Sequence, residues 1–211
     1  MSRNIGPKAK LSKRVGRNLF LKGARSFSAK DDFTKRPGKP GKAADKFAGF
    51  AKLSEYGKHV TEKQAVRFTY GLTEKQMGNL FKKAFVATGD TGKIALTQLE
   101  RRLDNVIYRS GLANSRAQAR QLVNHGHFFI NGTKANIPSM LVDAGDVITV
   151  KPNKVTNAFW TNFKLEVPLE KVTWLEKKDK TVRVINEPLE EDLPQEFNTG
   201  YLVEYYSRKV R

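Results

Sequence analysis

Basic side chains are concentrated in the first third of the chain, and this composition constrains what that part can fold into. Residues 1–67 hold 18 basic and 5 acidic side chains, whereas residues 68–211 hold 21 and 16. Residues 35–42 alternate basic residues with Pro and Gly, which exclude a helix there. The sequence therefore predicts an extended basic arm over residues 1–42, disordered alone because it buries too little apolar surface. On a nucleic acid it would order through counterion release; a solvated tail without a specific partner is the alternative.

The formal net charge of +18 over 211 residues indicates a polyanionic partner. Nucleic acid is the first choice and an anionic membrane surface the second, because solubility alone needs a charge on the order of 2–8. The absence of cysteine excludes disulfides, thiolate catalysis and Cys-ligated metal centres. No apolar run approaches the roughly 20 residues of a membrane span, and no apolar stretch follows the basic start as in a secretory signal. Glycines and Pro7 disfavour an amphipathic transit peptide.

Helical periodicity begins after the arm and continues to Gly126. A rough apolar stripe runs over residues 44–56, and two patterns of a Thr followed three residues later by Gln or Glu predict capped helix starts, at Thr73 and Thr97. Glycine closes most of these segments, as expected at helix C-termini. The predicted helices span residues 44–56, 61–70, 73 to just before 89, 97–110 and 115–125.

After Gly126 the apolar period changes to that of strands. Residues 128–130 and 133–137 flank Asn131-Gly132, a dipeptide that supplies the positive φ angles of a tight hairpin turn. A further strand is expected at 147–150, weaker ones at 165–167, 172–175 and 181–185, and a short helix at 200–211. The four aromatic residues between 153 and 180 are expected in the core. The fold class is therefore α+β, with a helix pair packed on a small, mostly antiparallel sheet.

No group of residues predicts catalysis. Asp90-Thr91-Gly92 matches the tripeptide of aspartic proteases, but that chemistry needs two such carboxylates. The segment 89–93 is too short for a phosphate loop, and Ile94 stands where a magnesium-binding Ser or Thr is required. His59, His125 and His127 lack a third metal ligand in evident spacing. We expect no catalytic residue, no metal, no cofactor and no small-molecule substrate.

The most informative stretch for binding is residues 115–127. Arg116 and Arg120 are four residues apart and so project from one helical face, with Gln121 on its shoulder. The helix start attracts phosphate, and the hairpin tip adds Asn131 and Lys134. This pattern predicts a cationic ridge that fits a phosphate-lined groove, with His125 and His127 touching RNA. A solvated helix face is the alternative.

Residues 115–132 and 143–148 closely resemble the small RNA-binding domain named after the fourth protein of the small ribosomal subunit. That domain also occurs in pseudouridine synthases, a heat-shock RNA-binding protein and bacterial tyrosyl-tRNA synthetases. The flanks look like the ribosomal protein family itself, of bacterial type: 6–8, 63–71, 73–76, 99–109 and 203–208. The resemblance covers nearly the whole chain. Many members carry a zinc knuckle of cysteines in the arm, which this chain lacks, so RNA contacts alone would hold the arm.

The resemblance implies a structural component of the cytoplasmic small ribosomal subunit, with an organellar ribosome as the weaker alternative. The family binds 16S ribosomal RNA directly at a helix junction in the 5′ domain and nucleates assembly of the subunit body. It touches neighbouring proteins, chiefly the fifth, a contact that influences translational accuracy, and it lies near messenger RNA where that enters the ribosome. A non-ribosomal RNA-binding regulator, or an RNA-modification enzyme with the same small domain, is the alternative. The enzyme would need a catalytic domain for which these residues leave no room.

The family fold implies three parts: a basic arm at 1–42, a helical domain of 43–93 plus 193–211, and an inserted α+β RNA-binding domain at 94–192. No membrane partner is expected. Nine RNA-facing residues follow from matching family motifs: Arg67, Tyr70, Arg109, Arg116, Gln118, Arg120, Gln121, His125 and His127. Further expected RNA-binding residues are Arg3, Lys8, Lys10, Lys13, Arg14, Arg17, Lys63, Lys82, Lys83, Arg101, Ser115, Asn131 and Lys134.

Overall fold

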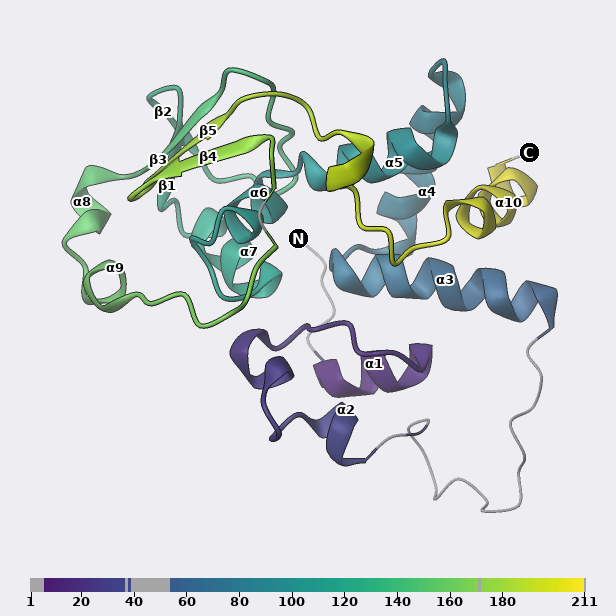
Figure 1. Ribbon diagram of the computed structural model, residues 1–211. Coiled ribbons are helices and arrows are strands. Elements are labelled where there is room, and N and C mark those ends of the chain that lie inside the picture. Colours follow the sequence, from purple (N-terminus) through teal and green to yellow (C-terminus); the bar gives the residue numbers. More distant parts are fainter. Residues whose placement is uncertain (1–5, 37, 39–53, 171, 211) are drawn as a thin grey trace. The chain divides into compact units, whose positions relative to one another are not determined.

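The computed structural model describes residues 6–36, 38, 54–170 and 172–210 (Figure 1). The chain forms two compact units, Met1–Ala95 with Gln195–Arg211, and Leu96–Pro194. Arg3 and most of the helix predicted over residues 44–56 lie outside the described residues. Within the described ranges, no helix is long and apolar enough to cross a membrane.

The N-terminal part of the first unit is helical rather than extended. It contains α1 (Lys8–Val15), the 3₁₀ turn η1 (Gly23–Phe27) and α2 (Asp32–Lys35), and α1 packs on α3. Leu11 and Leu19 are buried, and the Leu19 N–H donates to the Ser12 hydroxyl. The expectation of an extended arm is therefore wrong for residues 6–36. The composition of this segment did not reveal that its few apolar side chains suffice for α1 to pack on another helix.

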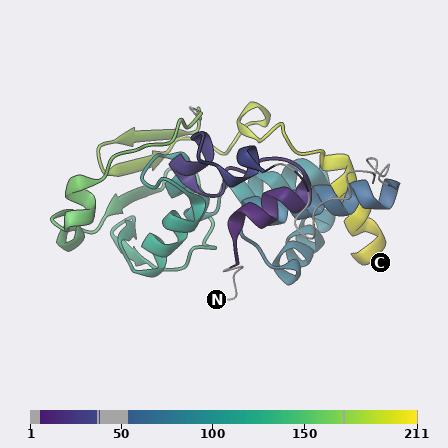
Figure 2. The same cartoon turned by 90° about the horizontal axis from the view of Figure 1, so that it is seen from below.

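Three longer helices complete the first unit: α3 (Glu55–Thr69), α4 (Glu74–Val86) and α10 (Thr199–Val210). The predicted capping box of Thr73 and Gln76 is present at the start of α4. Helix α3 begins six residues earlier than predicted, because the Ser54 hydroxyl accepts from the Gly57 N–H. Figure 2 shows α10 (yellow) crossing α3 (blue), and the rings of Phe81 and Tyr206 stack in the core with centroids 4.3 Å apart.

The single helix predicted over residues 97–110 is wrong, because the structure divides it into α5 (Thr91–Glu100) and α6 (Leu103–Arg109). Arg102 has an extended backbone, and the loop at 138–142 takes over hydrogen bonds that a continuous helix would make. The Leu103 N–H donates to the Met140 carbonyl, and the Val142 N–H donates to the Arg101 carbonyl. The break therefore depends on a distant loop.

The second unit contains a five-stranded antiparallel sheet of order β2-β1-β3-β5-β4. Asn131 and Gly132 have φ angles of 49° and 80°, which confirms the predicted hairpin turn. The strand predicted at 165–167 is absent, because its backbone pairs with Asn114, which donates to the Lys164 carbonyl and accepts from the Glu166 N–H. The strand predicted at 172–175 is displaced to β4. The strands are β1 (Phe128–Ile130), β2 (Thr133–Ala135), β3 (Val147–Val150), β4 (Leu175–Lys178) and β5 (Thr181–Val184).

Helices α6 and α7 (Arg116–Asn124) share one core with the sheet, and Figure 1 shows them on one side of it. The short helices α8 (Pro152–Val155) and α9 (Ala158–Asn162) follow β3, and the 3₁₀ turn η2 (Glu190–Asp192) lies in the acidic segment at residues 187–192. Of the four aromatic residues predicted in the core, Trp160 and Trp174 are buried, and Phe159 and Phe163 are half-buried. The α+β class, with a helix pair packed on an antiparallel sheet, is confirmed.

Candidate nucleic-acid interface

Among the described residues, the predicted RNA-facing cations of the first unit that are exposed lie on two helices. Lys10 and Arg14 are exposed on α1, and Lys82 and Lys83 are exposed on α4. Lys8 and Lys13 are half-buried on α1. Arg17 is half-buried, and its guanidinium pairs with Glu62 at 3.1 Å and donates to the Glu196 carbonyl.

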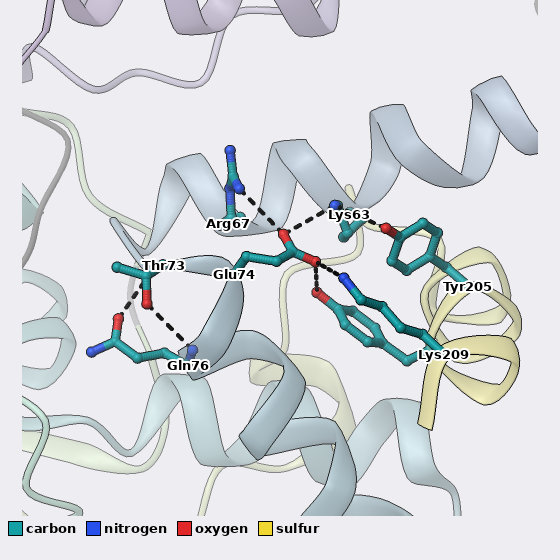
Figure 3. Close-up of polar contacts among 8 residues, drawn as sticks. Lys63, Arg67, Thr73, Glu74, Gln76, Tyr205 and Lys209 are labelled. Atoms are coloured by element: carbon teal, nitrogen blue, oxygen red, sulfur yellow. Dashed lines mark hydrogen bonds and ion pairs between the residues drawn. The ribbon is translucent and has the colours of Figure 1, made fainter. Parts of the chain in front are cut away.

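Two further predicted cations of this unit contact Glu74 (Figure 3). Lys63 Nζ and Arg67 Nη1 lie 3.0 and 3.2 Å from Glu74 Oε2. From α10, the Tyr206 hydroxyl and Lys209 Nζ both donate to Oε1 at 3.3 Å. Burial alone would raise the pKa of the Glu74 carboxyl, but the hydrogen bonds and charges of Lys63 and Lys209 hold that pKa below its ordinary value.

These residues therefore join three helices. Burial raises the pKa of the Tyr206 phenol, and the Glu74 charge adds to that shift, so the hydroxyl stays a donor. Lys63 and the predicted RNA-facing Tyr70 are both buried, and the Tyr70 ring lies 6.4 Å from that of Phe197. The RNA contact of Lys63 and Tyr70 stays a prediction, and both side chains are buried within the unit.

In the second unit, the face of α7 that carries Arg116 and Arg120 is turned towards α6. Arg120 is 5% exposed, and its Nη1 lies 3.3 Å from the carboxylate of Asp104, which also pairs with Arg102. Arg116 Nε donates to the Asn105 side chain at 2.7 Å, and its guanidinium lies over the Tyr108 ring. The two arginines share a face, as predicted, but the exposed ridge is wrong for Arg120.

Two more predicted arginines bind acidic side chains within the same unit. Arg109 donates through Nε and Nη2 to the two oxygens of Glu100, a fully buried carboxylate that also accepts from Asn105. Arg101 pairs with Asp143 and Glu187 and donates to the Val142 carbonyl. These contacts connect loops and helices within the unit.

Ser115 and Gln118 close the start of α7. The Ser115 hydroxyl accepts from the Gln118 N–H at 3.2 Å, and the Gln118 side chain accepts from the Asn114 N–H at 2.7 Å. Both side chains are half-buried. Their observed role is to cap the helix and fix the preceding loop.

The exposed polar residues of this unit's predicted site gather where α7 ends beside the β1–β2 hairpin. Gln121 and His125 are exposed on the helix end, and Lys134 is exposed on β2. The Lys134 side chain passes over Gly126, where its Cε would lie 3.1 Å from a Cβ. Asn131 is exposed, but its side chain secures the turn by donating to Asp146 and accepting from the Val147 N–H.

His127 lies below this surface and is buried. Its Nδ1 accepts a hydrogen bond from the Trp160 indole N–H at 2.9 Å, so the ring is held in the fold rather than directed outwards. Burial lowers the pKa of His127, and the charges of Lys154 and His125 lower it further. The RNA contact of His127 stays a prediction, and the observed role of the ring is its hydrogen bond to Trp160 within the fold.

Sequence reasoning missed two lysines at the start of α8. Lys151 Nζ lies 5.8 Å from the centre of the Phe129 ring, and Lys154 is close enough to depress the His127 pKa. The Lys-Pro-Asn-Lys turn directly after β3 was the available signal. We name the surface formed by Gln121, His125, Lys134, Lys151 and Lys154 the hairpin surface. It places cations beside the Phe129 ring, and this combination of positive charge and an aromatic side chain suits RNA.

No set of three His, Asp or Glu side chains in the described ranges is arranged to hold a metal ion.

The family described as "Ribosomal protein S4/S9 N-terminal domain" matches residues 3–100, and the "S4 domain" matches residues 101–148. Curated proteins named "Small ribosomal subunit protein uS4" align over 99% of this chain and their own full length. They come from Caldicellulosiruptor saccharolyticus (43% identical), Clostridioides difficile (41%) and Gloeobacter violaceus (44%).

The chain belongs to the uS4 family. The family predicted from the motifs is thereby confirmed over nearly the whole sequence. The uS4 family consists of structural ribosomal proteins, so the expectation that the chain is not an enzyme is confirmed as well. The two matched segments meet at residues 100–101, directly before the break between α5 and α6.

Proposed function

We propose that this uS4 chain is a component of the cytoplasmic small ribosomal subunit and binds 16S rRNA directly, at a helix junction of the 5′ domain. In this role it nucleates assembly of the subunit body. The observation that carries the proposal is the similarity, over 99% of the chain, to bacterial proteins named for the small ribosomal subunit. The net charge of +18 supports it, because rRNA presents a dense array of phosphates.

The proposed protein partners are the neighbouring small-subunit proteins, chiefly the fifth, through a contact that supports translational accuracy. The chain also lies near messenger RNA where that enters the ribosome. Both statements extend what the resemblance to the family implies. The division into an arm at 1–42, a helical domain of 43–93 plus 193–211, and an inserted domain at 94–192 likewise remains part of this proposal.

We assign RNA contact first to the exposed residues. These are Gln121, His125 and Lys134 of the hairpin surface, with Lys10 and Arg14 of α1 and Lys82 and Lys83 of α4, whereas Lys151 and Lys154 of the hairpin surface are half-buried. Phosphate contacts from such residues position the protein, and shape complementarity selects the junction. The half-buried or buried members of the predicted site act through the fold, because they hold the helices and loops that present the exposed residues. These members are Lys63, Arg67, Tyr70, Arg101, Arg109, Arg120 and His127.

The test is competition binding of the full chain to a 16S rRNA 5′-domain transcript against excess tRNA. Tight binding that survives the competitor is expected. The double substitution His125→Ala with Lys134→Ala should weaken binding about tenfold, since it removes two contacts from the hairpin surface. Arg183→Ala is the control, because Arg183 is an exposed cation on β5 outside the proposed surface. Binding that tRNA abolishes would contradict the proposed function, and equal binding by the double variant would contradict the assignment of the surface.

A further inference from the structure

Two aromatic side chains near the N-terminus are both exposed and in contact with each other. Phe20 is 42% exposed and Phe27 is 44% exposed. Their ring centroids lie 4.7 Å apart with an interplanar angle of 17°, so the rings stack. Most large apolar side chains of this unit's helices are buried, so a pair of rings left open to solvent needs an explanation.

The backbone holds Phe20 in an unfavourable conformation. Its φ angle is 48°, in the left-handed region, which non-glycine residues adopt rarely and bulky ones more rarely still. The adjacent Leu19 is 4% exposed, so this conformation lets one residue enter the core while the next points outwards. Strained backbone of this kind persists only where the surroundings fix it.

The surroundings consist of a hydrogen-bond network centred on Asn18. The Asn18 side chain accepts from the Phe20 N–H at 3.0 Å and donates to the Ser26 carbonyl and to Asp31. The Ser26 hydroxyl in turn accepts from the Lys22 N–H. The network joins the loop that carries Phe20 to the 3₁₀ turn that carries Phe27. The stacked pair is therefore preorganised.

The charge around the pair favours a polyanion. Residues 6–36 contain ten basic and two acidic side chains. Asp31 is buried and accepts a hydrogen bond from the Asn18 amide, and Asp32 pairs with Lys22 and Arg25, so neither acidic group presents an unpaired charge at the surface. Arg14 and Lys30 remain exposed. The positive charge of this surface would repel another basic ribosomal protein, even one with an apolar segment to offer, whereas it would attract RNA.

We propose that Phe20 and Phe27 form an aromatic ledge on which an unpaired base of the bound RNA stacks. The inference rests on the proposed rRNA binding and names a contact within it. Every base has a π-face, so a rigid aromatic platform binds an unstacked nucleotide without reading its hydrogen-bonding edge. The neighbouring cations hold the backbone of the same nucleotide, and the ledge adds affinity that does not depend on salt.

The experiment compares affinities for the 16S rRNA 5′-domain transcript across a salt series. Phe20→Leu and Phe27→Leu keep an apolar side chain but remove the ring, and each should weaken binding roughly tenfold. Phe20→Tyr, which keeps the ring, should bind like the unmodified chain. Because stacking releases no counterions, the slope of log affinity against log salt should stay unchanged. Tyr56→Leu is the control, since Tyr56 is an aromatic side chain of the same unit that is 61% exposed.

Leucine variants that melt normally and bind like the unmodified chain would overturn the ledge and leave the proposed function intact. A changed salt slope would also overturn it, because the loss would then come from displaced cations. If Phe20→Leu fails to fold, Phe27→Leu carries the test, since its backbone is not in the left-handed region. Loss of discrimination between the transcript and tRNA by the unmodified chain would instead overturn the proposed function, and the ledge with it.

Discussion

At the residue scale, the main result is that many arginines and lysines predicted to face RNA are used inside the fold. Helical spacing places Arg116 and Arg120 on one face, but it cannot tell whether that face meets solvent or another helix. The deciding partners are Asp104 and Asn105 on α6, which the sequence does not connect to α7. Charged side chains are rarely buried unless they are paired, so we expect them to be exposed when no partner can be identified from the sequence. The expectation of exposure was wrong for Arg120, because an ion pair with Asp104 connects α7 to α6.

Replacing Arg120 should therefore affect folding more than RNA contact. In Arg120→Ala, Asp104 keeps Arg102 but loses its second cation in a buried site, so the free energy of unfolding should fall by about 2–4 kcal/mol. Urea unfolding measures the change. Gln121→Ala is the control, because the neighbouring Gln121 is exposed on the same helix and should leave stability nearly unchanged. Equal stability of the two variants would refute a structural role for Arg120.

At the element scale, most local signals predicted elements correctly, except the helix start at Thr97, which lies inside α5, and elements that depend on distant contacts were missed. The capping box of Thr73, the Ser115 cap and the Asn131-Gly132 turn each involve neighbouring residues, and all are present. The break between α5 and α6 needs the loop at 138–142, and the helices within residues 6–36 need a surface on α3. Neither partner is visible in a local window of sequence, so both predictions failed there.

The packing of α3, α4 and α10 around Glu74 should depend on pH. The folded state holds the pKa of Glu74 below its ordinary value of 4.5, so the ionised carboxylate stabilises the unit above that pH. The stabilisation should be lost as pH falls through the lower folded-state pKa. At pH 7, Glu74→Gln should reduce the free energy of unfolding by about 1–2 kcal/mol, with the difference shrinking below about pH 4.5.

Chemical unfolding at pH 7 and pH 3 measures this dependence. Glu55→Gln is the matched control, because Glu55 pairs with Lys58 on the exposed surface of α3. That variant should behave like the unmodified chain at both values. A Glu74→Gln difference that is the same at pH 7 and pH 3 would mean that the carboxylate charge contributes nothing.

At the scale of the whole molecule, the charge is divided unequally between compact units that each have their own core. Composition predicted the polyanionic partner correctly in class, and motifs identified the family, because both are properties of the chain rather than of its packing. They could not show which cations remain available. Of the cations predicted to bind RNA on α1, only Lys10 and Arg14 are exposed, and Lys8 and Lys13 are half-buried. The binding of RNA by this region should therefore rest on fewer cations than the sequence suggests.

The salt dependence of binding measures that number. Each phosphate contact contributes roughly 0.7–0.9 to the slope of log affinity against log salt, so Lys10→Ala with Arg14→Ala should reduce the slope by roughly 1.4–1.8. The charge-preserving pair Lys10→Arg with Arg14→Lys should keep it. A titration with the 5′-domain transcript between low and moderate salt resolves the difference. An unchanged slope in the alanine variant would mean that α1 faces away from the RNA backbone. The phosphate contacts of the described part of the first unit would then belong to Lys82 and Lys83 of α4, because those are the other predicted cations that are exposed there.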